Sequence, residues 1–196
     1  MKKYLKRQIK KIRTALIRSI LKFLLKNKFE IQKILGELIL PSVGKVGNDV
    51  RLHGHVDIRN PERLEIGDYV RIGNGCFFFC KGGLRIGKNT QISRNVTIYT
   101  ANHDIKGNAI PYDDKYNYKP VVIGESVWIG MNVCITPGVS IGDGAIIGMG
   151  STISKDVSAG EIVVSQKMRS IGNRDMEKFL QADNNELFFG KLWPNK

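Results

Sequence analysis

Residues 123–158 read IGESVW IGMNVC ITPGVS IGDGAI IGMGST ISKDVS, a repeat of six residues that indicates the fold class. An isoleucine opens each of the six blocks, a glycine follows it in four of them, and the fifth position is always small or β-branched. A period of six, with an inward aliphatic residue and a glycine that permits tight corners, is typical of a parallel β-helix. In such a fold three blocks make one coil, and stacked coils bury the aliphatic positions in one interior.

The same period continues toward the N-terminus with one small change. Large apolar openers recur every six residues within groups of three blocks and every eight residues between groups, at Val46, Leu52, Ile58, Ile66, Ile72, Phe78, Ile86, Ile92 and Ile98. The sequence therefore predicts an all-β fold with helical appendages, built on a β-helix of about five coils. The expected coils span residues 46–65, 66–85, 86–103, 123–140 and 141–158.

The repeat is interrupted between Ile98 and Ile123. Residues 104–120 are polar, contain prolines and tyrosines, and do not fit a coil. Long loops inside compact repeats are uncommon and usually functional. We therefore predict an inserted loop that leaves the third coil directly after His103.

Length and charge limit the functional classes. A chain of 196 residues is long enough for one well-buried domain and an appendage. Residues 1–40 hold twelve basic and two acidic residues, so they carry +10 of the net charge of +13. Because this charge belongs to one segment and no nucleic-acid-binding motif accompanies it, we expect no nucleic-acid partner. Three cysteines without a CxxC pair indicate buried thiols in a reducing cytoplasm.

Residues 1–30 are predicted to form a basic amphipathic helix, because apolar residues recur at steps of three and four between lysines and arginines. Charges interrupt every apolar run before it reaches the ~18 residues that span a bilayer. No small-residue cleavage site follows, so we do not expect a signal peptide. Two interpretations remain open. The helix packs on the protein or a neighbouring subunit, or residues 1–30 lie on the anionic inner face of the membrane.

These patterns suggest three segments. Residues 1–40 are the basic helical segment, residues 41–172 are the repeat domain with its loop at 104–120, and residues 173–196 are a C-terminal tail. The tail contains a cluster of apolar residues, and we expect it to cap the open end of the coil stack or to pack across subunits, since exposed strand edges need covering: Leu187, Phe188, Phe189, Leu192 and Trp193.

Three motifs resemble the hexapeptide-repeat acyltransferases, in particular those similar to the maltose, galactoside and colanic-acid O-acetyltransferases. They are TANHDI at 100–105, the stretch from Lys119 to Val157, and more weakly IVVSQKMRSIG at 162–172. The resemblance covers about residues 46–174. It implies a left-handed coil, acetyl-CoA as co-substrate without a required metal, and a homotrimer with its sites between subunits.

The chemistry of acetyl transfer can be argued beside this resemblance. An attacking hydroxyl needs a base to take its proton, and histidine is the side chain that titrates near neutrality. His53 and His55 belong to the first coil, whereas His103 stands where the loop departs. His103 also matches the NH motif of the family. We therefore expect His103 to be the general base.

The resemblance implies further site residues. Matched positions suggest cofactor-binding roles for Trp128, Gly130, Met131, Met149, Ser154, Lys155 and Arg169. On the acceptor side, a count back from His103 reaches Gly73, beside Asn74, where relatives often carry an asparagine. Asn102 and Asp104 flank His103, and Tyr112 belongs to a tyrosine-rich stretch able to stack on sugar rings. We expect these four residues to bind substrate.

The predicted function is acetyl-CoA-dependent O-acetylation of a sugar hydroxyl, in a capsular or other cell-surface polysaccharide or its precursor. The basic N-terminus suits an anionic carbohydrate acceptor. One alternative is N-acetylation of an amino-sugar nucleotide. Another is a zinc-binding β-helix of the carbonic-anhydrase type, suggested by the His53-x-His55 pair. We expect a cytoplasmic protein, at the inner membrane face if the helix binds lipid.

Overall fold

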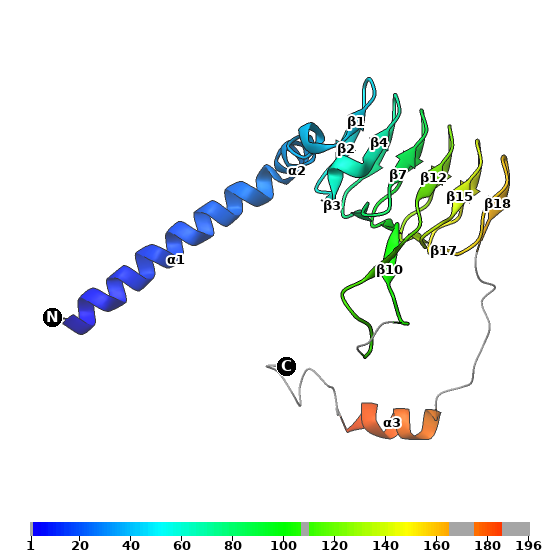
Figure 1. The fold of residues 1–196 in the computed structure, drawn as a ribbon. Coiled ribbons are helices and arrows are strands. Elements are labelled where there is room, and N and C mark those ends of the chain that lie inside the picture. The colour runs from blue at the N-terminus through cyan, green and yellow to red at the C-terminus, as the bar shows by residue number, and fades with distance from the viewer. Residues whose placement is uncertain (1, 107–109, 165–174, 186–196) are drawn as a thin grey trace. The chain divides into compact units, whose positions relative to one another are not determined.

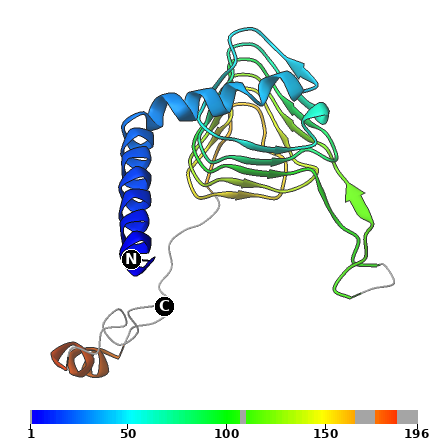
Figure 2. The same cartoon turned by 90° about the vertical axis from the view of Figure 1, so that its left-hand side faces the viewer.

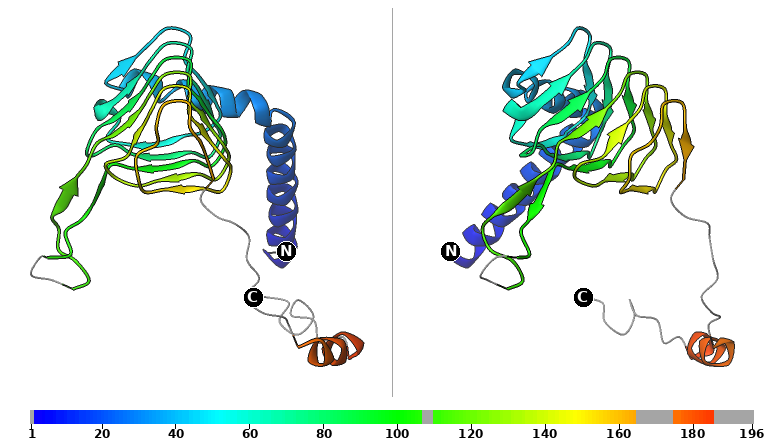
Figure 3. Two further views of the ribbon diagram at one scale, coloured as in Figure 1. Left: turned by 90° about the vertical axis from the view of Figure 1, so that its right-hand side faces the viewer. Right: turned by 45° about the vertical axis from the view of Figure 1, so that its right-hand side comes forward.

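The computed structural model of the chain describes residues 2–106, 110–164 and 175–185 (Figure 1). Its repeat region is a stack of triangular coils, as the views along the stack show (Figures 2 and 3). Each side of the triangle is a parallel sheet to which successive coils contribute one strand each. The prediction of a parallel β-helix is confirmed, and the arrangement is consistent with left-handed winding.

The three sheets are named here by the order in which a coil visits them. Face 1 contains β1 (Lys45–Val46), β4 (Leu64–Ile66), β7 (Leu84–Ile86), β12 (Val121–Ile123) and β15 (Ser140–Ile141). Face 2 contains β2 (Arg51–His53), β5 (Arg71–Gly73), β8 (Gln91–Ile92), β13 (Trp128–Ile129), β16 (Ile146–Ile147) and β18 (Ile162–Val163). Face 3 contains β3 (Asp57–Arg59), β6 (Phe77–Phe79), β9 (Thr97–Tyr99), β14 (Cys134–Ile135) and β17 (Thr152–Ile153).

Strand pairing follows the predicted coils. Ile72 pairs with Ile92, and Ile98 pairs with Ile135 across the interruption, so the opener of each block lies beside the opener of the next coil. Beyond the fifth coil, Val157 bridges to Ile141 and β18 pairs with β16. The stack therefore contains five complete coils and the start of a sixth.

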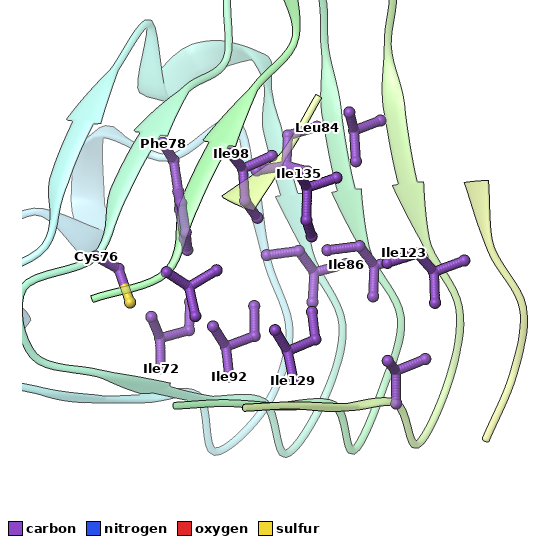
Figure 4. Close-up of a cluster of buried hydrophobic side chains, with 14 of the residues drawn as sticks. Ile72, Cys76, Phe78, Leu84, Ile86, Ile92, Ile98, Ile123, Ile129 and Ile135 are labelled. Carbon is purple, nitrogen blue, oxygen red and sulfur yellow. The ribbon is translucent and has the colours of Figure 1, made fainter. Parts of the chain in front are cut away.

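The interior is one continuous column of aliphatic side chains (Figure 4). Six successive block openers from coils three and four are at most 3% exposed: Ile86, Ile92, Ile98, Ile123, Ile129 and Ile135. Several corners hold asparagine in the left-handed region, including Asn95 and Asn132 at φ of 58°. The Asn95 amide donates to the Asn132 side-chain oxygen over 3.2 Å, which links the corners of coils three and four.

The N-terminal segment forms two helices rather than the single helix expected over residues 1–30. α1 (Lys2–Lys26) ends at Asn27, and α2 (Lys28–Glu37) follows. α2 packs on β2, where Gly36 lies so close to Leu52 that an added Cβ would meet its side chain at 2.8 Å. Gln32 of α2 accepts a hydrogen bond from the His55 backbone N–H. α2 thus covers the first coil.

The remaining elements are short. The 3₁₀ turns η1 (Leu40–Ser42) and η2 (Pro61–Arg63) lie between helix and strand or between coils. α3 (Met176–Asn184) belongs to a separate compact unit, residues 166–196. The apolar cluster predicted to cap the stack, residues 187–193, lies outside the described residues. None of the described helices is long and apolar enough to cross a bilayer.

The interruption begins three residues before the predicted loop of residues 104–120, in an antiparallel pair of strands that is the only described pair not running parallel. β10 (Ala101–His103) pairs with β11 (Tyr116–Tyr118), and His103 lies opposite Tyr116. The resulting hairpin leaves the stack at the corner between faces 3 and 1 (Figure 2).

Candidate functional site

The hairpin is anchored to the stack by Thr100, which is fully buried. Its hydroxyl donates to the Phe79 carbonyl and accepts from the Gly82 N–H, each over 2.7 Å. Its own carbonyl accepts from the Lys119 N–H over 2.9 Å. Both ends of the hairpin are therefore held at one residue, which fixes where β10 begins.

His103 ends β10, and its ring is held from several directions. Nδ1 lies 3.2 Å from the Asp113 carbonyl oxygen. The ring stacks on Tyr112 with centroids 3.9 Å apart and meets Tyr116 at 4.2 Å. A carbonyl only accepts hydrogen bonds, so this contact favours the tautomer with the proton on Nδ1. The lone pair of Nε2 is then free to accept a proton.

The aromatic contacts around His103 continue onto face 3. Tyr116 lies 6.0 Å from Phe79 between ring centroids, and Phe79 lies 5.5 Å from Tyr99. The Lys81 ammonium sits 3.8 Å from the Tyr116 ring centroid, a cation–π geometry. The outer face of the third sheet thus supports the tyrosine that contacts His103.

The other predicted hairpin residues have local roles in the structure. Asn102 is exposed, and its side-chain oxygen accepts from the His103 N–H over 2.9 Å. Asp104 is half-buried and accepts from the Lys106 N–H over 2.9 Å. The Asp104 carboxylate thus bonds to the backbone of its own turn, whereas Tyr112, 47% exposed, stacks directly on the His103 imidazole.

A second group of predicted residues lies along the corner between faces 2 and 3. Asn74, Met131 and Met149 occupy the third position of their blocks in coils two, four and five. Corner hydrogen bonds align these positions, with Asn95 N–H donating to the Asn74 carbonyl and Gly150 N–H donating to the Met131 carbonyl. The three residues therefore form one row along the stack.

Arg94 fills the gap in this row at coil three. Its carbonyl accepts from the Asn132 N–H over 3.0 Å, so it stands between Asn74 and Met131. No sequence motif pointed to Arg94. An alignment of the six-residue blocks by position would have revealed it, because Arg94 is the third residue of its block.

Trp128 and Gly130 belong to the same edge. Trp128 points outward from β13 and is 56% exposed. The Gly130 N–H donates to the Ile147 carbonyl over 2.8 Å, so this donor is already engaged within the stack. Within the described part of the chain no acceptor is paired with the Met131 N–H. Met131 therefore supplies an available backbone donor beside Trp128.

The last predicted residues lie at the opposite end of face 3. Ser154 and Lys155 are exposed and occupy the second and third positions of their block in coil five, as Tyr99 and Thr100 do in coil three. They share the corner from which the hairpin leaves. Arg169 lies outside the described residues.

The predicted site residues therefore divide between two corners of the triangle. Six residues separate equivalent positions at these corners, which is ~20 Å of extended chain. Trp128 and Met131 stand at one corner and His103 departs from the other. A single copy of the chain does not bring the two groups together.

A groove of about 1090 Å³ runs along the first of these corners, between the helices and face 2. Its wall includes Leu25, Lys26, Lys28 and Gln32 from the helical segment. Its floor includes His53, Arg71, Gly73, Asn74, Gln91, Ile92, Ser93, Arg94, Trp128 and Met131. Among the described residues, no hairpin residue and no carboxylate lines it.

Few of the described residues are suited to thiol or metal chemistry. Burial raises the pKa of the Cys76 thiol to about 11 and that of Cys80 to about 12, so both are protonated and unreactive near neutrality. Across residues 2–106, 110–164 and 175–185, no group of three histidine, cysteine, aspartate or glutamate side chains is arranged to hold a metal ion. His53 and His55 are both exposed.

Known proteins with the same repeat place these features in context. The family described as "Bacterial transferase hexapeptide (six repeats)" matches residues 120–155. WcaF of Escherichia coli K12, named as a colanic acid biosynthesis acetyltransferase, is 32% identical over 118 residues. That alignment covers 60% of this chain, and the chain spans 63% of the length of WcaF.

Two solved structures share the fold. A maltose O-acetyltransferase from Clostridium difficile 630 is 30% identical with a TM-score of 0.61, over 70% of this chain and 74% of that one. A hexapeptide-repeat-containing acetyltransferase from Vibrio cholerae O1 biovar eltor, solved with acetyl-CoA, is 25% identical with a TM-score of 0.62. It aligns over 81% of this chain and 91% of its own. Together with the repeat and its interruption at His103, these similarities show that the chain belongs to the hexapeptide-repeat acyltransferase family.

Proposed function

We propose that the protein transfers an acetyl group from acetyl-CoA to a sugar hydroxyl, with His103 as the general base. The observation that carries this proposal is the setting of His103, whose Nδ1 faces the Asp113 carbonyl while two tyrosines hold its ring. This arrangement leaves Nε2 ready to take the hydroxyl proton as the oxygen attacks the thioester carbon. The proton then leaves with the thiol when the carbon–sulfur bond breaks.

The edge that carries Trp128 and Met131 would hold the thioester end of acetyl-CoA. The Met131 N–H is the donor that we assign to the oxyanion, because the Gly130 N–H already donates to Ile147. Met149, Ser154, Lys155 and Arg169 are proposed to contact the rest of the cofactor. Asn74, Asn102, Asp104 and Tyr112 are proposed to contact the acceptor.

We infer that the site is completed in a homotrimer. The division of the site residues between two corners supports this, because a neighbouring copy can bring its hairpin corner to the edge that carries Trp128. Closed rings with one repeated interface satisfy such a head-to-tail contact. The test is to co-express His103→Ala and Trp128→Ala chains, each weakly active alone. Mixed trimers would regain about a quarter of the sites. No recovery would contradict a shared site.

The acceptor is proposed to be a sugar of a cell-surface polysaccharide or its precursor. The support is the similarity to WcaF and to the maltose enzyme, together with four tyrosine and histidine rings at the hairpin. The experiment measures thiol release from acetyl-CoA with a panel of simple sugars and capsular oligosaccharides. Loss of the acetyl product in mild base identifies an ester, whereas an amide survives and would favour the N-acetyltransferase alternative.

His103→Ala is expected to lower kcat/KM by about 10²- to 10⁴-fold, the usual contribution of a general base. His55→Ala, which removes another exposed histidine, serves as the matched control and should keep normal turnover. Near-normal turnover of His103→Ala on the best acceptor would contradict the mechanism.

We also propose that α1 holds the enzyme on an anionic membrane surface at the cytoplasmic face. α1 contains ten lysines and arginines and no acidic residue. Its large apolar side chains from Ile12 to Leu25 remain 43–71% exposed. Packing against the α1 of another copy would place like charges together, and nucleic acid would leave the apolar side chains in water. An anionic bilayer engages both kinds of side chain.

Co-sedimentation of the full chain with lipid vesicles tests this proposal. Binding is expected to vesicles that contain phosphatidylglycerol and to be weak with phosphatidylcholine alone. The double change Leu16→Glu with Ile20→Glu should abolish it. Leu38→Glu, at a residue 71% exposed outside α1, should not. Equal sedimentation with both lipids, or an unaffected double variant, would contradict membrane contact through α1.

A further inference from the structure

The groove beside Trp128 is lined by positively charged side chains that are not neutralised by nearby described carboxylates. Lys26, Lys28 and Arg94 line it, and among the described residues none of them is paired with a carboxylate. The fourth cation, Arg71, is different because it forms an ion pair with Asp49 at 2.7 Å. Three positive charges therefore face a concave space that contains no negative side chain.

The cations come from two parts of the chain that meet only in this fold. Lys26 and Lys28 flank the break between α1 and α2 at Asn27, and α2 is fixed on the first coil by Gln32. Arg94 stands in the corner row between Asn74 and Met131. Charges on both walls of one groove attract an anion more strongly than the same charges spread over a convex surface.

The position of the groove indicates which substrate the charges serve. It occupies coils one to four and reaches the transfer edge at Trp128 and Met131. The coil-five residues assigned to the cofactor, Met149, Ser154 and Lys155, do not line it. Both acetyl-CoA and an acidic sugar are anionic, but the groove extends from Trp128 and Met131 toward coil one, whereas Met149 follows Met131 in the direction of coil five. This placement favours the acceptor.

We propose that this groove binds an acceptor sugar that carries a negative charge, a carboxylate or a phosphate, close to the hydroxyl that is acetylated. This inference rests on the proposed transferase function and specifies its substrate class. Arg94 is the residue that we expect to contact the charged group, since it stands between Asn74 and Met131. Lys26 and Lys28 would contribute attraction from the opposite wall.

Binding can be measured without turnover, because Trp128 lines the groove. The chain has two tryptophans, so Trp193→Phe leaves Trp128 as the only one. Its fluorescence is followed while trigalacturonate or the neutral maltotriose is added to the full chain. A saturable change is expected with trigalacturonate, with at least ~10-fold weaker binding of maltotriose. It should weaken as salt screens the charges.

Arg94→Gln should weaken trigalacturonate binding by about 10-fold, consistent with loss of one charge-assisted contact. Arg85→Gln is the matched control, since Arg85 is an exposed arginine of β7 on face 1 and does not line the groove. Equal binding of both trisaccharides, absence of binding, or equal effects of the two substitutions would overturn the proposal.

Kinetics separate this inference from the function on which it rests. Acetylation of methyl glucuronide and methyl glucoside is compared in the wild type and Arg94→Gln. A rise in KM for the glucuronide alone supports the proposal, whereas a rise in KM for acetyl-CoA would assign the cations to the cofactor phosphates and overturn it. Turnover without acidic preference would leave the transferase function standing and refute the acidic acceptor. Binding of trigalacturonate without acetylation of any acceptor would leave the acidic binding site standing and refute the transferase function.

Discussion

The coil stack and the hairpin are both built of short strands, but different forces determine them. In the stack, every coil pairs in parallel and hides its block openers in one interior column. The hairpin pairs with itself, in antiparallel fashion, and most of its described side chains are exposed or half-buried. Burial of apolar side chains organises the coil stack, whereas local contacts around His103 organise the hairpin.

We therefore expect the stack to supply most of the stability and the hairpin to serve the proposed chemistry. Removing an interior side chain should change the free energy of unfolding, and removing a hairpin side chain should change turnover. Substitutions that break this division would show that the two regions depend on each other more than their contacts indicate.

The largest effect on stability is expected from Ile98→Ala. Ile98 is fully buried beside Ile135 and Phe78, so its truncation leaves a cavity that costs ~2–5 kcal/mol of unfolding free energy. Tyr118→Ala, in the hairpin at 54% exposure, should change it by less than about 0.5 kcal/mol. Chemical denaturation measures both. A similar loss of unfolding free energy in the two variants would contradict the proposed division between stack and hairpin.

Thr100→Val tests the junction between the regions. The change keeps the shape but leaves the Gly82 N–H and the Phe79 carbonyl without the Thr100 hydroxyl, at a cost of ~1–3 kcal/mol. Because the hydroxyl also fixes the start of β10, turnover should fall as well. Thr100→Ser keeps the hydroxyl and serves as the control. Loss of stability without any loss of turnover would show that the hairpin is positioned by other contacts.

Tyr116 is expected to act on catalysis alone. Tyr116→Ala removes a ring 4.2 Å from that of His103, so kcat should fall by about 10-fold while KM for acetyl-CoA stays constant. Tyr116→Phe keeps the ring and should restore kcat. If Tyr116→Phe were as slow as Tyr116→Ala, the hydroxyl rather than the ring would be the important group.

The smallest effect is expected at Asp49, at the outer surface of the stack. Hydrogen bonds from Arg71, and then from Arg51, lower the pKa of its carboxyl group below 3.8. A lowered pKa stabilises the fold above the unfolded-state pKa, and this contribution disappears as the pH falls through the folded-state value. Asp49→Asn should therefore melt slightly below the wild type at pH 7, and this difference should shrink as the pH falls through the lowered pKa of Asp49. A difference that grows in acid would contradict the pairing.

Much of the stack follows from the sequence, because burial repeats with the same period as the coil. The openers from Val46 to Ile153 predicted both the coils and their register. The repeat also predicted an insertion after coil three, but the hairpin leaves the stack after Thr100, so His103 lies on β10 within the hairpin. The row of residues at the corner between faces 2 and 3 was predicted only in part. Asn74, Met131 and Met149 were inferred from resemblance, and Arg94 was missed.

Contacts that do not repeat escaped prediction. Three contacts join residues that do not occupy repeating positions. They are the hydrogen bond between the Gly82 N–H and the Thr100 hydroxyl, the contact between the Asp113 carbonyl and His103, and the cation–π contact between Lys81 and Tyr116. The break between α1 and α2 at Asn27 was also missed, because the apolar spacing continues through it while α2 turns to pack on the first coil.

The closure of the hairpin at a single residue has a consequence for how the protein can diversify. Coil three pairs directly with coil four at Ile98 and Ile135, and the Lys119 N–H returns to the Thr100 carbonyl. The stack thus meets only two adjacent attachment points, whatever the length of chain between them. Hairpins of other lengths and compositions can be exchanged there without changing the register of the coils. The hairpin can therefore change in evolution independently of the fold of the stack.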